Sequence, residues 1–306
     1  MFHYYRDDWT VYDREHRHLV SSTRFVWQYA EQARRRAGTE QGDQSRALAL
    51  HAWAYVRDRH YDPEARLYHW SLRQHKPDGE PFFMYGQAFV LLALSALVRM
   101  GDVPEAQSRT EQLWDTLEAR FWEPAHNAYA DELPVDADTP VPYRGQNANM
   151  HACEACLALH AATGQDRYLQ RARALAETFC FRLPRDKGIW EHYNEQWHPD
   201  LDFNKDAKDN IFRPWGYQTG HQVEWAKLLL ILHEALPRPD YVDKAKALFD
   251  FAESYGRDRR HGGWIYGYDL DGLPCDSDKY FWVQAETFAA AYRLYAVTGQ
   301  SFLQKT

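Results

Sequence analysis

The chain has 306 residues, and its 45% hydrophobic content is sufficient for a sizeable buried core, which excludes a disordered protein. Its formal net charge of −8 argues against a nucleic-acid partner or an anionic membrane surface. The amino terminus has no apolar segment of signal-peptide length, and the longest apolar run, 88–98, is too short to cross a bilayer. We therefore expect a cytoplasmic protein without nucleic-acid or membrane partners.

Two kinds of helical segment alternate along the chain. The first kind is mainly apolar, and we expect it near residues 20–36, 85–100, 147–163, 218–236 and 281–297. Three of these segments end at a glycine turn, at Gly101, Gly164 and Gly299. Because a helix that is apolar on all sides has to be enclosed by other elements, we predict that these segments are inner helices.

The second kind of segment is amphipathic and more charged. Apolar residues recur there at three- and four-residue spacing, which is typical of one helix face, within 45–57, 107–122, 168–179 and 241–252. An aromatic stretch follows each of these outer helices. Asp78-Gly79 and Asp271-Gly272 are predicted to form the turns of short hairpins in two of those stretches.

The repeated unit is thus an inner helix, an outer helix and an aromatic connection. It predicts an all-α fold, an (α/α)6 barrel of helical hairpins that occupies residues 1–306 as a single domain, with an open superhelical solenoid as the alternative. Five inner helices are readable where a closed ring needs six, so we expect the barrel to be incomplete at both chain ends. An apolar flank left uncovered in this way would favour a homo-oligomer.

Polar residues stand near the starts of the inner helices. Residues three apart on a helix project from one face, and all inner helices are expected to start at the same end of the barrel. The polar groups should then converge on one axial pocket, where titratable side chains are candidates for acid–base chemistry. They are Arg24, His151 with Glu154, His221 with Glu224, and Gln284 with Glu286.

Two other chemistries remain open from the residues alone. Di-metal carboxylate bundles carry Glu-x-x-His motifs, whereas the order here is His-x-x-Glu and the bridging carboxylates are incomplete. Glycoside hydrolysis needs paired carboxylates, which Glu154, Glu224 and Glu286 would supply, although the interleaved histidines fit that reaction poorly.

The motifs R-G-Q-N-A-N-M-H-A-C-E-A, G-H-Q-V-E-W and F-W-V-Q-A-E resemble the N-acylglucosamine 2-epimerase superfamily, and most of all its bacterial aldose–ketose isomerases that act on mannose. The resemblance covers nearly the whole chain and implies an (α/α)6 barrel that needs no metal or nucleotide cofactor. It implies interconversion of D-mannose and D-fructose by histidine acid–base catalysis, with lyxose and xylulose as a further candidate pair of substrates. A 2-epimerase of free or N-acylated sugars and a non-catalytic sugar-binding barrel are the alternatives.

The same resemblance implies roles for nine residues. His221 would be a catalytic acid–base that Glu224 orients, and Arg24 would hold substrate oxygens at the floor of the pocket. The catalytic set is His221, Glu224, His151 and Arg24, and the substrate-binding set is Tyr85, Asn147, Arg213, Trp282 and Glu286. The family's second catalytic histidine lies in a Y-H motif on the last inner helix, and no such helix is readable after 281–297.

Overall fold

The computed structural model describes residues 3–101, 103–207, 210 and 212–300, and it is mainly helical. The chain forms two compact units, which consist of Met1–Val141 with Glu154–Tyr168 and of Pro142–Cys153 with Leu169–Thr306. The expectation of one domain over the whole chain stays a prediction. No helix among the described residues is long and apolar enough to cross a membrane.

The five predicted inner helices are present, and their bounds agree with the prediction to within one residue at each end. They are α1 (Leu19–Arg35), α3 (Met84–Met100), α5 (Gln146–Thr163), α7 (Thr219–Ala235) and α9 (Phe281–Thr298). Gly101, Gly164 and Gly299 follow three of them with positive φ, as helix-terminating glycines do. Helix α5 starts in the second unit and continues into the first.

The outer helices also form, but they begin two to five residues earlier than predicted. They are α2 (Glu40–Tyr55), α4 (Pro104–Arg120), α6 (Asp166–Ala176) and α8 (Pro239–Phe251). Their polar first turns carry helix-start signals that apolar periodicity does not reveal, such as Thr39 capping Gly42 N–H at 3.1 Å and proline at the first position of α4 and α8. A π-helical turn follows three outer helices, as η1 (Val56–His60), η2 (Glu177–Arg182) and η3 (Ala252–Gly256).

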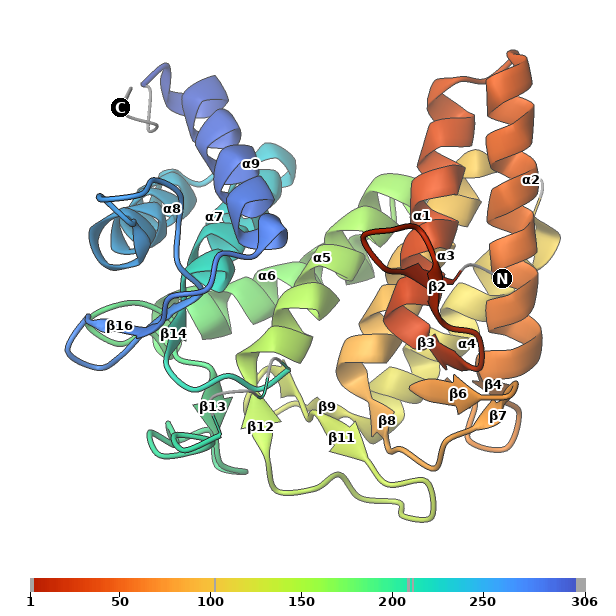
Figure 1. The fold of residues 1–306 in the computed structure, drawn as a ribbon, viewed down its shortest axis with the longest axis horizontal. Coiled ribbons are helices and arrows are strands. Elements are labelled where there is room, and N and C mark those ends of the chain that lie inside the picture. Colours follow the sequence, from red (N-terminus) through yellow and green to blue (C-terminus); the bar gives the residue numbers. More distant parts are fainter. Residues whose placement is uncertain (1–2, 102, 208–209, 211, 301–306) are drawn as a thin grey trace. The chain divides into compact units, whose positions relative to one another are not determined.

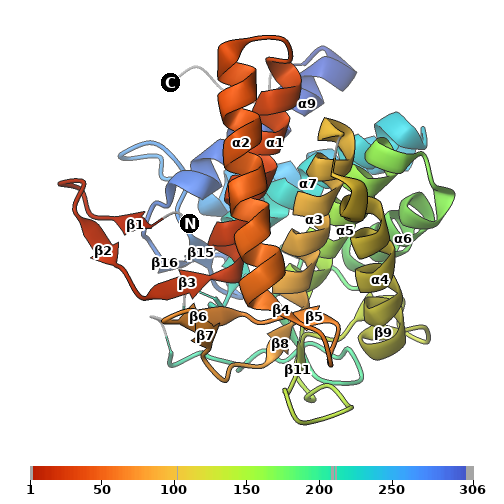
Figure 2. The same ribbon diagram turned by 90° about the vertical axis from the view of Figure 1, so that its right-hand side faces the viewer.

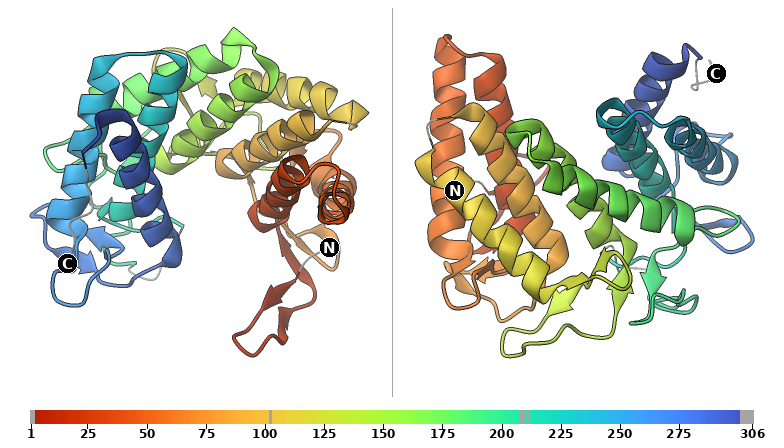
Figure 3. Two further views of the ribbon diagram at one scale, coloured as in Figure 1. Left: turned by 90° about the horizontal axis from the view of Figure 1, so that it is seen from above. Right: turned by 180° about the vertical axis from the view of Figure 1, so that it is seen from behind.

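In the first unit, α1 packs against both α2 and α3, and α3 packs against α4 (Figures 1 and 2). Helix α3 is buried on nearly all sides, with Ala88, Val90 and Leu94 fully removed from solvent. In the second unit, α7 packs against α8 and α9 (Figure 3) and buries Trp225 and Leu229 completely. Enclosure by neighbouring helices therefore accounts for the mainly apolar sequences of α3 and α7.

Short antiparallel strands form the connections. In the first unit they are β1 (Tyr4–Tyr5), β2 (Val11–Asp13), β3 (His16–His18), β4 (Tyr61–Asp62), β5 (Leu67–Tyr68), β6 (Ser71–Arg73), β7 (Lys76–Pro77), β8 (Phe82–Phe83), β9 (Trp122–Glu123), β10 (Ala128–Tyr129) and β11 (Glu132–Leu133). They pair as β1–β2, β3–β6–β7, β4–β5, β8–β11 and β9–β10. In the second unit β12 (Arg144–Gly145) pairs with β13 (His192–Tyr193), and β14 (Tyr217–Gln218), β15 (Gly267–Tyr268) and β16 (Pro274–Asp276) form one sheet.

One of the two predicted hairpin turns is wrong. The β6–β7 turn consists of Gln74 and His75, with φ of 49° and 65°, and not of Asp78-Gly79. Two-residue hairpins favour turns with positive φ at both central residues, and here non-glycine residues adopt that conformation. The turn at Asp271-Gly272 is confirmed between β15 and β16, where Gly272 N–H donates to the Asp269 carbonyl at 3.0 Å.

The starts of four inner helices, α1, α3, α5 and α7, are bonded to the connections in the same way. The first residue donates its backbone N–H, which has no partner inside the helix, to a connection carbonyl. The pairs are Leu19 to Trp70 (2.9 Å), Met84 to Asp131 (2.8 Å), Gln146 to Glu191 (3.0 Å) and Thr219 to Tyr266 (3.0 Å). This repeated bond fixes each connection next to the first turn of a helix.

A glutamine at the fourth position of three inner helices makes a second repeated link. Its amide accepts from the N–H and donates to the C=O of one connection residue. The pairs are Gln87 with Tyr68 (3.0 and 2.8 Å), Gln222 with Ile189 (2.8 and 3.0 Å) and Gln284 with Trp264 (2.9 and 2.8 Å). Gln284, expected in the pocket, is instead a structural residue, because both of its amide atoms are bonded to backbone.

Candidate active site

The predicted site residues occupy repeated positions on the inner helices. The sixth residue is Arg24 in α1, His151 in α5, Glu224 in α7 and Glu286 in α9. The second residue is Tyr85 in α3, Asn147 in α5 and Trp282 in α9. Because residues four apart share a helix face, the second and sixth positions define one face on each inner helix. His221, the third residue of α7, stands between these two positions.

His221 is bonded to a carboxylate that sequence analysis did not select. Its Nδ1 lies 2.9 Å from Oε2 of Glu191, and the two residues are only 6% and 3% exposed. The expectation that Glu224 orients His221 is therefore corrected. Glu191 lies 30 residues earlier, directly before β13, and the pairing of β12 with β13 brings it to the start of α5. Two signals in the sequence marked it, its position in a repeated aromatic connection and the motif E-H-Y-N-E-Q-W that begins with it.

Two further buried side chains complete this cluster. Nε2 of Gln146 lies 2.9 Å from both Glu191 Oε2 and His221 Nδ1. The indole N–H of Trp225 donates to Oε1 of the same glutamine at 2.7 Å. The four side chains come from α5, α7 and the residue before β13, and all of them belong to the second unit.

The charges around His221 favour its protonated form. Burial alone acts to lower the pKa of the imidazole, but the charge and hydrogen bond of Glu191, with smaller contributions from Glu224 and Glu286, raise the pKa above its ordinary value. A histidine with a raised pKa gives and takes protons near neutral pH, which suits it to general acid–base chemistry.

Glu224 lies in a second group of charges on the same helix. Its Oε1 is 4.0 Å from Nδ1 of His151 and 3.6 Å from Nζ of Lys227. Lys227 also donates to Glu286 at 2.5 Å, which ties α7 to α9. Lys227 was not among the predicted residues, although its place three residues after Glu224, on the same face of α7, was readable.

Three predicted substrate-binding residues lie in the same unit. Oδ1 of Asn147 is buried and has no hydrogen-bond partner among the described residues, so it is available to accept from a hydroxyl. The ring of Trp282 lies 5.4 Å from the His221 ring and rests on Gly220, where a Cβ would come within 2.3 Å of the indole. The Arg213 guanidinium stacks on the Tyr143 ring at 4.0 Å.

Arg24 and Tyr85 belong to the first unit. The Arg24 guanidinium lies 4.9 Å from the Phe89 ring, and the Tyr85 ring is 5.1 Å from the same phenylalanine. Arg24 also lines a cavity of about 350 Å³ with Arg17, His18 and other residues. The expectation that Arg24 and Tyr85 share a pocket with His221 stays a prediction.

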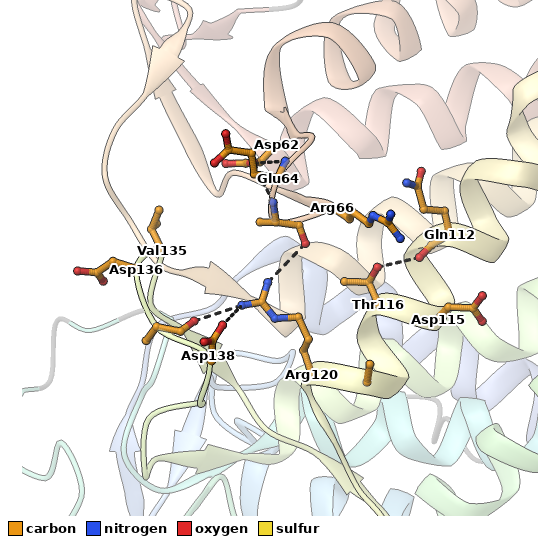
Figure 4. A pocket seen from close by; sticks show the side chains of 13 residues that line it. Asp62, Glu64, Arg66, Gln112, Asp115, Thr116, Arg120, Val135, Asp136 and Asp138 are labelled. Carbon is orange, nitrogen blue, oxygen red and sulfur yellow. Dashed lines mark hydrogen bonds and ion pairs between the residues drawn. The ribbon is translucent and has the colours of Figure 1, made fainter.

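A larger hollow of about 660 Å³ in the first unit contains none of the predicted site residues (Figure 4). Within it Arg120 donates to the carbonyls of Ala65 and Ala137 and lies 3.8 Å from Asp138. No histidine lines it. Since its central cation is used to hold two loops, we assign this hollow no part in the acid–base site.

The fold and the site define this protein as a member of the class of helical-hairpin folds in which a buried histidine–carboxylate pair lies at the starts of the inner helices. The model of the family described as N-acylglucosamine 2-epimerase (GlcNAc 2-epimerase) matches residues 1–306. The chain therefore belongs to this family, as its motifs indicated.

Similar proteins agree with this family and with the fold. The D-mannose isomerase of Marinomonas mediterranea is 45% identical over 300 residues, which cover 97% of this chain and 75% of the relative. A crystal structure of D-mannose isomerase matches with a TM-score of 0.92 and 45% identity over 98% of this chain and 76% of the other. The cellobiose 2-epimerase structure from Spirochaeta thermophila shares the fold, at 18% identity and a TM-score of 0.59 over 92% of this chain and 87% of the other. The predicted all-α fold class is confirmed.

Proposed function

We propose that this protein is an aldose–ketose isomerase that interconverts D-mannose and D-fructose, with a monosaccharide as its partner and no metal or nucleotide cofactor. The observation that carries the proposal is the buried His221–Glu191 pair at the start of α7. The 45% identity to a protein named D-mannose isomerase supports the choice of substrate.

The proposed reaction moves a proton between neighbouring carbons of the open-chain sugar. The C2–H bond of the aldose breaks as a base takes the proton, and the electron pair forms a C1–C2 double bond while O1 gains a proton. The enediol then loses the proton on O2 and accepts one at C1, which gives the ketose. Imidazole serves this exchange because its pKa lies near neutrality.

His221 is the proposed acid–base group. Arg213 would stabilise the enediolate oxygens, since guanidinium keeps its charge and offers a forked set of donors. The Trp282 ring would stack on the apolar face of the sugar, and Oδ1 of Asn147 would accept from a hydroxyl group. His151, whose Nδ1 lies 4.0 Å from Oε1 of Glu224, is the second proposed proton-transfer group.

The decisive experiment is incubation of the protein with D-mannose, followed by chromatographic separation of the sugars with and without a chelator. D-Fructose as the first product supports the proposal. D-Glucose as the first product would show a 2-epimerase, because the proton then returns to the opposite face of C2. Binding of mannose without any product would show a sugar-binding protein, and loss of activity on chelation would show a metal site.

A further inference from the structure

The orientation of the Gln146 side chain follows from its partners. An indole N–H can only donate, so the Gln146 atom 2.7 Å from Trp225 Nε1 is the accepting oxygen, Oε1. The amide nitrogen Nε2 must then point toward Glu191 and His221, where it lies 2.9 Å from each. Trp225 is fully buried, so no solvent competes for this bond.

This orientation determines which atom of neutral His221 carries the proton. An ionised carboxylate can only accept, and Oε2 of Glu191 faces both Gln146 Nε2 and His221 Nδ1 at 2.9 Å. Gln146 Nε2 could donate to an unprotonated Nδ1, but it has the charged carboxylate oxygen as an acceptor at the same distance of 2.9 Å. An unprotonated Nδ1 would place a lone pair against that oxygen, whereas a protonated Nδ1 donates a charge-assisted bond to it. Nδ1 therefore carries the hydrogen, and the lone pair of the neutral ring is on Nε2.

The backbone around Glu191 is also held from two helices. Its carbonyl accepts from Gln146 N–H at 3.0 Å, at the start of α5. Two residues earlier, both backbone groups of Ile189 are bonded to Gln222, which directly follows His221 in α7. The carboxylate and the imidazole are thus placed by neighbouring residues of the same two helices.

We propose that Glu191 is a positioning residue of this site: held by Gln146 and Trp225, it keeps the proton of neutral His221 on Nδ1 and presents Nε2 to the substrate. The catalytic consequence rests on the proposed function, whereas the tautomer does not depend on any activity. The other carboxylates that act on His221 are Glu224 and Glu286, which face it from α7 and α9. Lys227 lies between those two carboxylates and neutralises part of their charge.

The first test is a ¹⁵N NMR measurement of the histidine tautomers in the unmodified protein. Two other buried histidines are internal references. His60 donates from Nδ1 to the His69 carbonyl at 2.9 Å, and His192 donates from Nε2 to the Pro214 carbonyl at 2.8 Å. The signals of His221, identified by their loss in His221→Gln, should match the His60 pattern above the pKa of His221. A match to the His192 pattern would overturn the proposal.

The second test compares Glu191→Gln, Glu191→Asp and the control Glu253→Gln. Glu253 is a partly buried glutamate of the same unit that accepts from the indole N–H of Trp264 at 3.0 Å. Glu191→Gln should lower kcat about 10²-fold with KM changed less than about threefold, because proton transfer is lost but sugar contacts remain. Glu191→Asp should recover part of kcat, and Glu253→Gln should keep it.

Removing the Glu191 charge lowers the pKa of His221, so the limb of the pH–rate profile that reports His221 should move to lower pH in Glu191→Gln. An unchanged kcat and pH profile in this variant, with native circular dichroism, would overturn the positioning role. If the unmodified protein turns over no sugar but its His221 shows the Nδ1–H tautomer, the proposed isomerase function fails and the tautomer assignment stands.

Discussion

Buried histidines in the two units differ in protonation although their burial is similar. In the first unit, burial lowers the pKa of the half-buried His18 and of the fully buried His60 to about 4, and neighbouring histidines add to the shift of both. His60 bonds a backbone carbonyl and no carboxylate. In the second unit, His221 is buried like His60, but the Glu191 carboxylate raises its pKa. The charges that the fold brings to a ring, and not burial by itself, decide whether it is protonated.

His192 shows how local this difference is. It directly follows Glu191, yet burial lowers its pKa and outweighs the raising effects of the Glu191 charge and of the bond to the Pro214 carbonyl. Its two nitrogens bond the Tyr143 hydroxyl at 2.9 Å and the Pro214 carbonyl at 2.8 Å, and neither bonds a carboxylate. Glu191 instead turns its carboxylate to His221. Residues adjacent in the sequence thus have different surroundings. We assign the acid–base role to His221, and not to His192, because His221 is the histidine that bonds the carboxylate.

The largest effect should come from removing the imidazole of His221. His221→Ala should lower the rate of mannose isomerisation by about 10²–10⁴, since one general acid–base group is lost, while helical circular dichroism is retained. The assay is initial-rate formation of ketose. A variant that turns over normally would show that the site lies elsewhere. The difference in protonation between His221 and the histidines of the first unit would then have no bearing on catalysis.

Acid should destabilise the protein through the histidines of the first unit. Because the folded-state pKa of His18 is about 4, below the ordinary 6.5, the unfolded chain binds more protons in this window, and the free energy of unfolding falls as pH drops from 6.5 to 4. The loss for this residue is about 3 kcal/mol. Urea denaturation at pH 7 and pH 4 measures it.

The matched variant for this experiment is His18→Asn. His18 caps α1 by accepting from Val20 N–H at 3.2 Å, and asparagine is a favoured capping residue that does not titrate. The variant should keep its stability at pH 7 and lose less of it at pH 4 than the unmodified protein. Equal losses in both would contradict the low pKa of His18.

A smaller effect, on stability and on the KM for mannose, is expected when the Trp282 ring beside His221 is crowded by an added methyl group. In Gly220→Ala the new methyl group would lie 2.3 Å from the Trp282 indole, so the ring must move, which costs about 1–3 kcal/mol in a packed site. We expect a lower melting temperature and a raised KM for mannose. Gly86→Ala in α3 is the control, because the nearest atom there is the end of the Leu19 side chain at 3.0 Å. Equal effects in both variants would argue against a special role for the Trp282 ring.

The smallest effect on catalysis should come from Glu224→Gln. Glu224 contributes less than Glu191 to the raised pKa of His221 and lies nearer to His151 and Lys227. The rate should fall about tenfold, less than in His221→Ala, and the His221 limb of the pH–rate profile should move slightly to lower pH. A loss as large as that of His221→Ala would assign Glu224 a direct proton-transfer role.

Much of this fold was predictable because the repeat imposes one physical requirement many times. A helix enclosed by its neighbours must be apolar on most sides, so the bounds of α3 and α7 follow from hydrophobicity and a terminal glycine or polar residue. The starts of α2 and α4 were missed, since their first turns are polar and exposed. Capping residues, and not periodicity, mark such starts.

The sequence by itself determined the helices, the family and the face of α7 that carries His221, because these depend on spacing along one chain segment. It did not determine the partner of His221, since Glu191 lies 30 residues away and is placed beside the ring by the pairing of β12 with β13 and by the bonds of Ile189 to Gln222. Nor did it distinguish Gln284, which holds backbone, from Glu286, which pairs with Lys227. Only the tertiary structure decides such questions, because the energy of a buried charge depends on the groups packed against it from other elements.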